Sequence, residues 1–80
     1  MNTTTAKSVR ALAKDVRFAK DELVVFLADG REIHAPLEWF PVLRNAKESQ
    51  RNKWRLIGGG VGIHWPDLDE DISVAGLLAV

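Results

Sequence analysis

The residues best suited to chemistry lie in one acidic stretch that follows His64. Residues 67–71 read DLDED, so four carboxylates stand within five positions of the chain. Alternate aspartates can offer oxygens to a hard cation, and a nearby imidazole can complete a transition-metal site. The run lacks the glycine and the bidentate glutamate of an EF-hand loop, and His64 falls between two apolar residues, as a structural histidine does. We therefore predict no metal or cofactor, and acids that cap turns and the last helix: Asp67, Asp69, Glu70 and Asp71.

A glycine cluster precedes this stretch and raises the question of phosphate binding. Its members are Gly58, Gly59, Gly60 and Gly62. A P-loop needs lysine and then serine or threonine after its last glycine, but here Ile63 follows. A dinucleotide site needs a βαβ unit, which the elements predicted below do not supply. We predict instead a glycine-lined turn at which backbone segments pack closely.

Four aromatic residues near basic ones are the candidates for an interface. They are Trp39, Phe40, Trp54 and Trp65, with Arg44, Arg51, Lys53 and Arg55 close by in the sequence. Such rings can stack on nucleic-acid bases or anchor a protein interface. We assign Trp54 and Phe40 to the core. Trp39 and Trp65 are predicted to be interface residues, because each lies close to a proline where the chain changes direction.

Nucleophilic catalysis finds little support in the chain. There is no cysteine, and the serines at positions 49 and 73 fall at predicted turn or cap positions. His34 and His64 fall on different predicted strands, and nothing in the sequence requires them to meet. We therefore favour a protein that is not an enzyme.

The composition describes one small domain with a large apolar fraction. The chain has 80 residues, of which 46% are apolar, and no cysteine for a disulfide. Domains of this size rarely gain more than about 3–5 kcal/mol from one core, so self-association or a partner is expected to cover apolar surface. The net charge is zero, but successive blocks of twenty residues carry +4, −4, +4 and −4. Such alternation would let two copies meet with opposite charges facing each other.

Hydrophobic periodicity predicts an α+β fold. A period of two, interrupted by turn residues, predicts a three-stranded antiparallel meander over residues 16–20, 22–28 and 31–35. The stretch from Leu23 to Ala28 is apolar on both faces, as in a central strand. Asp29 and Gly30 predict a type I′ hairpin turn with positive φ at both residues.

The second half of the chain is predicted to be mixed. A helical segment is expected at 37–54, then a short strand at 62–65, and Ser73 is a suitable N-cap for a last helix over 74–80. These elements make a single small α+β domain over residues 15–80. Residues 1–14 are expected to be a flexible or partly helical extension.

Four runs of this sequence are similar to a known family. They are DGR at 29–31, PLEWFP at 36–41, WRLIGGG at 54–60 and GIHWPDLDEDI at 62–72. Together they resemble a bacterial family known as domain of unknown function 2442, across about four-fifths of the chain. The resemblance implies a small α+β domain and no catalytic residues, and it leaves the role of the glycine and acidic motif unknown.

The same resemblance implies a context of use. Some family members are encoded beside another tiny protein in an arrangement like a toxin–antitoxin pair. Some longer members carry an appended helix-turn-helix domain, which this chain, ending at Val80, is expected to lack. A DNA-binding role is therefore not carried over.

These observations predict a non-enzymatic protein-interaction or regulatory domain that is antitoxin-like. Its expected partner is itself, as a homodimer through Val24, Phe26 and Trp65, or another small protein. The alternative is a small metal-binding protein or enzyme that uses His64 and the acidic run, and a nucleic-acid binder comes third. No stretch approaches the roughly 18 uninterrupted apolar residues of a membrane span. The N-terminus is too charged for a signal peptide, so we expect a cytoplasmic protein with no membrane partner.

Overall fold

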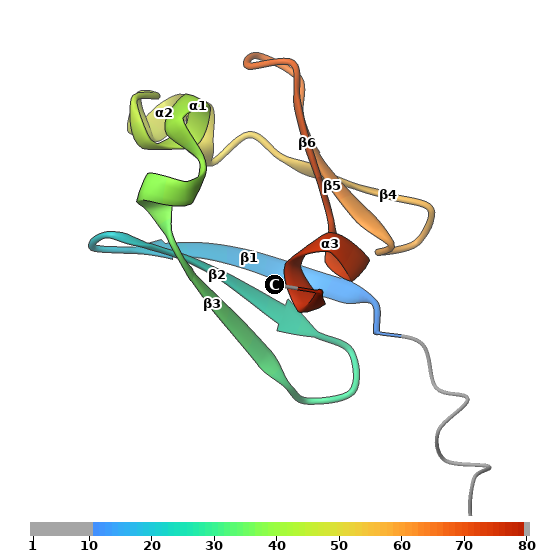
Figure 1. The fold of residues 1–80 in the computed structure, drawn as a ribbon. Coiled ribbons are helices and arrows are strands. Elements are labelled where there is room, and N and C mark those ends of the chain that lie inside the picture. Colours follow the sequence, from blue (N-terminus) through green and yellow to red (C-terminus); the bar gives the residue numbers. More distant parts are fainter. Residues whose placement is uncertain (1–10, 80) are drawn as a thin grey trace, which may run out of the picture.

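The computed structural model describes residues 11–79 and consists of two small antiparallel sheets that face each other (Figure 1). The first sheet has the strand order β1-β2-β3 and the second has the order β4-β5-β6. A short helical segment connects them, and a last helix, α3, follows β6. The elements are β1 (Ala13–Ala19), β2 (Glu22–Leu27), β3 (Glu32–Pro36), η2 (Leu37–Trp39), α1 (Pro41–Arg44), α2 (Glu48–Arg51), β4 (Arg55–Ile57), β5 (Gly62–Trp65), β6 (Glu70–Ser73) and α3 (Val74–Leu78).

The predicted meander is confirmed, with β2 as its central strand. Strand β1 begins at Ala13, so residues 13 and 14, which we assigned to the N-terminal extension, are part of the sheet. The pairing with β2 is irregular between Ala13 and Asp15, where Lys14 is the additional residue of a β-bulge. The rest of the predicted extension, residues 1–10, lies outside the described residues.

The β2–β3 turn is a correction to the predicted type I′ turn. Gly30 has a φ of +97°, but the φ of Asp29 is not positive. The Gly30 amide donates to Leu27 O at 3.1 Å, and the Leu27 amide donates to Arg31 O at 2.8 Å. This is a three-residue loop, in which a left-handed glycine follows an ordinary turn. The Asp29 carboxylate accepts from the Arg31 amide at 3.0 Å and so fixes the loop.

The second sheet was only partly predicted. Strand β5 was expected at 62–65 and is found there. Its two neighbours were not predicted: β4 has only three residues, and β6 lies inside the acidic run. The alternation of Glu70 and Ile72, both oriented toward the core, with the exposed Asp71 and Ser73 is the period-two signal, but four residues are too few to show it against the charges.

The predicted helical segment at 37–54 is broken into η2, α1 and α2. Pro41 occupies the first turn of α1, where its missing amide costs no hydrogen bond. Arg51 then joins the two helices, because its guanidinium donates to Leu43 O at 2.8 Å and to Arg44 O at 2.7 Å. Ser73 caps α3 as predicted, and its Oγ accepts from the Gly76 amide at 2.9 Å. No helix within residues 11–79 is long and apolar enough to span a membrane.

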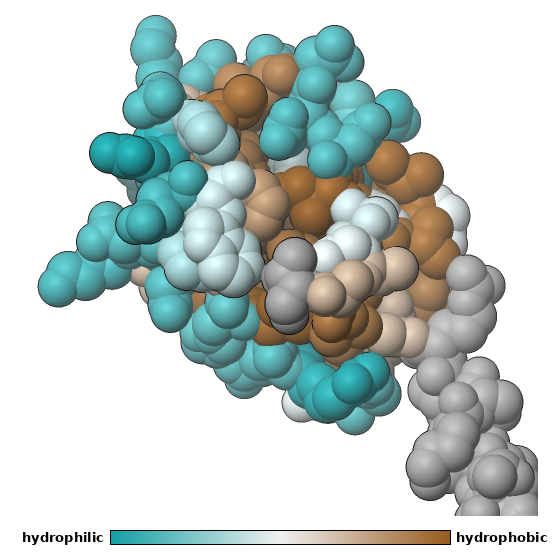
Figure 2. Space-filling view, in the orientation of Figure 1, coloured by the Kyte–Doolittle hydropathy of each residue, from teal (hydrophilic) through white to brown (hydrophobic). Residues whose placement is uncertain are grey.

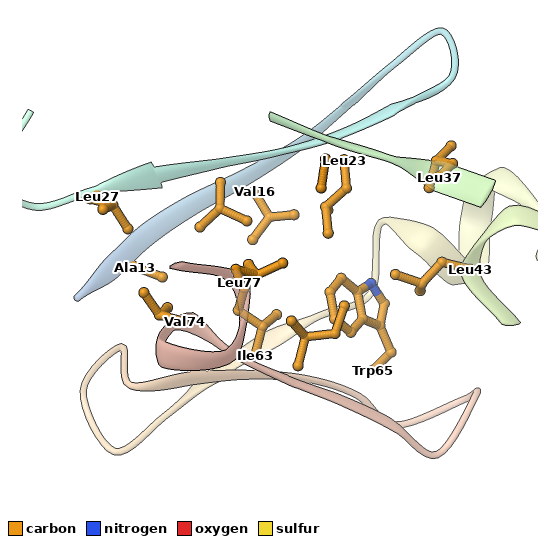
Figure 3. Packing of buried hydrophobic residues seen from close by; sticks show 13 residues of the cluster. Ala13, Val16, Leu23, Leu27, Leu37, Leu43, Ile63, Trp65, Val74 and Leu77 are labelled. Atoms are coloured by element: carbon orange, nitrogen blue, oxygen red, sulfur yellow. The ribbon is translucent and has the colours of Figure 1, made fainter. Parts of the chain in front are cut away.

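The core lies between the two sheets and ends against the helical segment (Figure 3). Val16, Leu23 and Leu27 extend from the first sheet toward Ile63 and Trp65 of the second. Trp65 is fully buried, and it contacts Phe18 edge-to-face with ring centroids 6.3 Å apart. Its indole N–H donates to Arg51 O at 2.9 Å. Trp65 is therefore a core residue, contrary to its predicted place at an interface, because its strand faces the other sheet.

Candidate functional site

An apolar groove lies between the helical segment and the second sheet. It has a volume of about 440 Å³ and is called the Trp39 groove below. Figure 2 shows exposed apolar surface on this side of the molecule, between the helical segment and α3. The residues that line the groove are Trp39, Phe40, Glu70, Asp71, Ile72, Ser73, Gly76 and Leu77.

One wall of the groove is a tryptophan that the fold holds at the surface. Pro36 ends β3, and the tight turn of η2 follows. Leu37 is buried at 3% exposure and anchors this turn, whereas the Trp39 side chain remains 54% exposed. Phe40 packs partly against the core beside it. Tryptophan is among the residues most often found as the anchor of a protein interface, and here an exposed tryptophan lies on a segment fixed by a buried leucine.

The opposite wall is β6 with the first turn of α3. Among the residues the structure describes, β6 pairs only with β5, so it is an edge strand. Ile72 is buried between the sheets and Leu77 closes the end of the core, with 8% and 7% exposure. The wall is therefore the backbone edge of β6 together with packed apolar side chains.

The acidic run forms the β5–β6 turn and β6, and it does not assemble a metal site. His64 and Asp71 are cross-strand neighbours and form a hydrogen-bonded pair. Asp67 pairs instead with Lys53 Nζ at 3.3 Å, and Asp69 adopts a positive φ of 51° in the turn. Within residues 11–79 no group of three or more histidine or acidic side chains is arranged to hold a metal ion.

The glycine cluster forms the β4–β5 turn and joins the two sheets. Gly58, Gly59 and Gly60 all have positive φ. The Ala13 amide at the start of β1 donates to Gly60 O at 2.8 Å. A Cβ at Gly60 would lie 2.5 Å from Ala13 O, so only glycine fits there. The expected close approach of two backbone segments is confirmed.

Two of the four basic residues named as stacking neighbours, Arg51 and Lys53, are held in contacts within the fold. Trp54 packs against the core, as predicted. The Arg51 guanidinium is occupied by backbone carbonyls and lies 5.7 Å from the Phe18 ring centroid, while Lys53 is paired with Asp67. Cations bound in this way are poorly placed for nucleic-acid phosphates.

The face predicted for a homodimer is the outer face of the first sheet. Val24 is only 5% exposed there, and Phe26 is half-buried. Arg17 lies with its guanidinium 6.0 Å from the Phe26 ring centroid, and His34 lies beside Val24 in the register of β3. Val24 thus offers little apolar surface on this face, and charged or titratable side chains lie beside both residues.

On this face His34 bridges two carboxylates. Its Nδ1 lies 3.0 Å from Glu22 Oε1, and its Nε2 lies 2.9 Å from Glu32 Oε1. Both ring nitrogens can donate only when the imidazole is charged. The hydrogen bond to Glu22, and to a lesser extent that to Glu32, raises the pKa of His34 above its ordinary value of 6.5.

A raised folded-state pKa predicts that His34 stabilises the fold at low pH. The contribution is fully present below pH 6.5, the ordinary value, and is lost as pH rises through the higher folded value. Between pH 5 and pH 9 we expect the urea midpoint of the parent to fall relative to that of His34→Gln. Parallel midpoints for the two proteins across this range would contradict the bridge.

Most of the groove was not foreseen from the sequence. Trp39 was predicted to be an interface residue, and Glu70 and Asp71 were singled out for other reasons. Ile72 was missed because β6 has only four residues, and Gly76 and Leu77 were missed because only tertiary packing brings the predicted last helix to the groove. For Ile72 the available signal was the period-two pattern of residues 70–73, which the acidic residues obscure.

Comparison with known proteins gives a family and two solved structures of the same fold. The family model described as "Protein of unknown function (DUF2442)" matches residues 13–80. A crystal structure of a protein of unknown function from Rhodospirillum rubrum is similar with a TM-score of 0.75 and 29% identity, over 89% of this chain and 88% of that one.

A solution NMR structure of an uncharacterized protein from Chromobacterium violaceum has a TM-score of 0.73 at 23% identity, over 95% of this chain and 71% of that one. This second likeness concerns the fold alone. Among curated proteins, none matches the chain in sequence. The family match spans both sheets and every residue of the Trp39 groove. The chain belongs to the DUF2442 family of proteins of unknown function.

Proposed function

We propose that this protein is a non-enzymatic interaction domain that binds a small protein partner in the Trp39 groove. The observation that carries the proposal is the combination of a 54% exposed tryptophan with an edge strand across an apolar groove. Aromatic anchors of this kind supply much of the binding energy in protein interfaces. An antitoxin-like, regulatory pairing is the form of this function that the family resemblance suggests.

The groove supports binding better than it supports chemistry. Its polar side-chain groups are two carboxylates, one serine hydroxyl and the Trp39 indole N–H, and the hydroxyl already accepts a hydrogen bond as the cap of α3. His64, the candidate general base next to the groove, forms a hydrogen bond with Asp71 and not with a nucleophile. A general base needs a reacting group within hydrogen-bond reach, and the side-chain partner of His64 is a carboxylate.

A second copy of the chain remains one of the partners considered. The predicted contact through Val24 and Phe26 would bury Arg17 and His34 with them, and removing such charges from water is costly. No arginine or histidine lines the Trp39 groove. If the protein self-associates, we therefore expect the groove to take part, and not the outer face of the first sheet.

Replacing Trp39 by serine should remove partner binding and leave the fold intact. Truncating a hot-spot aromatic typically costs about 2 kcal/mol or more of binding energy, whereas an exposed side chain contributes little to stability. The measurement is capture of the native partner by the immobilised parent protein and by Trp39→Ser, followed by a dissociation constant for the captured partner.

The matched control is Leu78→Ser, because Leu78 is similarly exposed at 46% but lines a different hollow beside α3. We expect this variant to bind as the parent does. Equal binding by Trp39→Ser and the parent, with all three proteins folded, would refute the proposed site.

A further inference from the structure

We propose that the occupant of the Trp39 groove is an extended, basic peptide segment of the partner that adds to β6 as a fourth strand of the second sheet. The inference rests on the proposed function, because it specifies what the same groove binds. Three features of the described residues carry it. They are a free strand edge, an apolar wall beside that edge, and a lining that contains acids without cations.

The first feature is the direction of the β6 backbone groups. The Val74 amide donates to Val61 O at 3.0 Å, so residue 74 is a hydrogen-bonded position of the ladder. Ile72, two positions before Val74, is paired with Ile63. Bonded and non-bonded pairs alternate in an antiparallel ladder. The amides of Asp71 and Ser73 therefore point away from β5, toward the free edge. An unpaired edge of this kind is a template for another extended backbone.

The second feature is the apolar wall beside this edge. Trp39 and Phe40 stand across the groove from β6, and Leu77 closes one end. Side chains of an added strand would alternate between this wall and the outer face of the sheet. Every second residue of the occupant is thus expected to be apolar and to lie against Trp39.

The third feature is charge. Glu70 and Asp71 line the groove, and no lysine or arginine does. Asp71 remains 69% exposed in its side chain while it is paired with His64, so it can meet a further cation on the outer face. Complementary charges favour the correct partner and exclude others. The residues of the occupant that alternate with the apolar ones are therefore expected to be lysine or arginine.

The test uses a synthetic seven-residue peptide in which valine and lysine alternate, with blocked ends, and the 80-residue chain. The affinity of the peptide for the protein is measured by calorimetry. Hydrogen exchange of individual amides of the protein is followed by NMR. Two matched peptides serve as controls. One replaces each lysine by glutamate, and the other carries N-methyl groups on alternate amides, which removes donors from one edge while keeping composition and charge.

We expect the valine–lysine peptide to bind and to slow hydrogen exchange at the Asp71 and Ser73 amides. The N-methylated peptide should bind at least about tenfold more weakly, because two or more hydrogen bonds are lost. The glutamate peptide should lose a similar factor through repulsion by Glu70 and Asp71. Trp39→Ser should lose binding, while Leu78→Ser should keep it.

Each other outcome overturns part or all of the inference. Equal binding of the glutamate peptide excludes a basic occupant, and equal binding of the N-methylated peptide excludes strand addition. Binding that survives in Trp39→Ser places the peptide elsewhere. A concentration-dependent dimer that Trp39→Ser abolishes makes a second copy the occupant. If no peptide binds while the native partner is still captured in a Trp39-dependent way, this inference is refuted and the proposed function stands.

Discussion

Replacing Gly60 by alanine is expected to unfold the protein. Gly60 has a φ of +121°, a conformation that residues with a Cβ rarely adopt. The added Cβ would also lie 2.5 Å from Ala13 O and 3.0 Å from Ala13 N, which are backbone atoms of the facing sheet. Neither can move without breaking the hydrogen bond between the Ala13 amide and Gly60 O. Strain and overlap together should exceed the stability of about 3–5 kcal/mol that a domain of this size has available.

Gly59→Ala is the matched control for this substitution. Gly59 also has a positive φ, +72°, but a Cβ there would meet nothing within 4 Å. It should therefore cost only the backbone strain of about 1–2 kcal/mol. Urea unfolding followed by circular dichroism separates the two. A folded Gly60→Ala protein with a midpoint equal to that of Gly59→Ala would show that the contact between the sheets is not tight.

Trp65→Ala is the second substitution with a large expected effect. Trp65 is fully buried and fills the space between Phe18 and the helical segment. Removing a buried aromatic side chain typically costs about 3–5 kcal/mol, so this variant should also fail to fold at ordinary temperature. Trp65→Phe keeps a ring but loses the bond to Arg51 O, so a loss of about 1–3 kcal/mol is expected.

Trp39→Ala is the natural comparison, because it removes the same side chain from the surface. It should change the unfolding midpoint very little, since Trp39 is 54% exposed. Thermal and urea denaturation of the three variants measure the difference. Similar losses at positions 39 and 65 would contradict the division of these tryptophans between groove and core.

The first sheet could be predicted because its strands are long enough to show a period. In β1 apolar and polar residues alternate from Val16 to Phe18, and β2 is a continuous apolar run from Leu23 to Leu27, as a central strand requires. The turn type was wrong because Asp-Gly fits both a two-residue and a three-residue loop. The hydrogen bond from the Leu27 amide to Arg31 O and the φ of Asp29 identify the three-residue loop, and the residue types in the turn specify neither.

The second sheet and the groove were harder to predict for a different physical reason. Strands β4 and β6 have three and four residues, and they exist because β5 pairs with both of them. Trp65 was wrongly predicted to lie at an interface. The neighbouring Pro66 indicates where the strand ends, but it does not indicate which face of the strand is buried against the other sheet. The groove joins Trp39 to Ile72 and Leu77, which only tertiary packing brings together.

The most direct test of the central claim is site-specific photocrosslinking in the native cell. A photoreactive phenylalanine analogue replaces Trp39 in one strain, Phe26 in a second and Leu78 in a third. We expect irradiation to attach one protein at position 39 and none at the other two positions, with the crosslinked peptide rich in lysine or arginine. Adducts at position 26 with none at position 39 would contradict the account, because binding would then use the outer face of the first sheet.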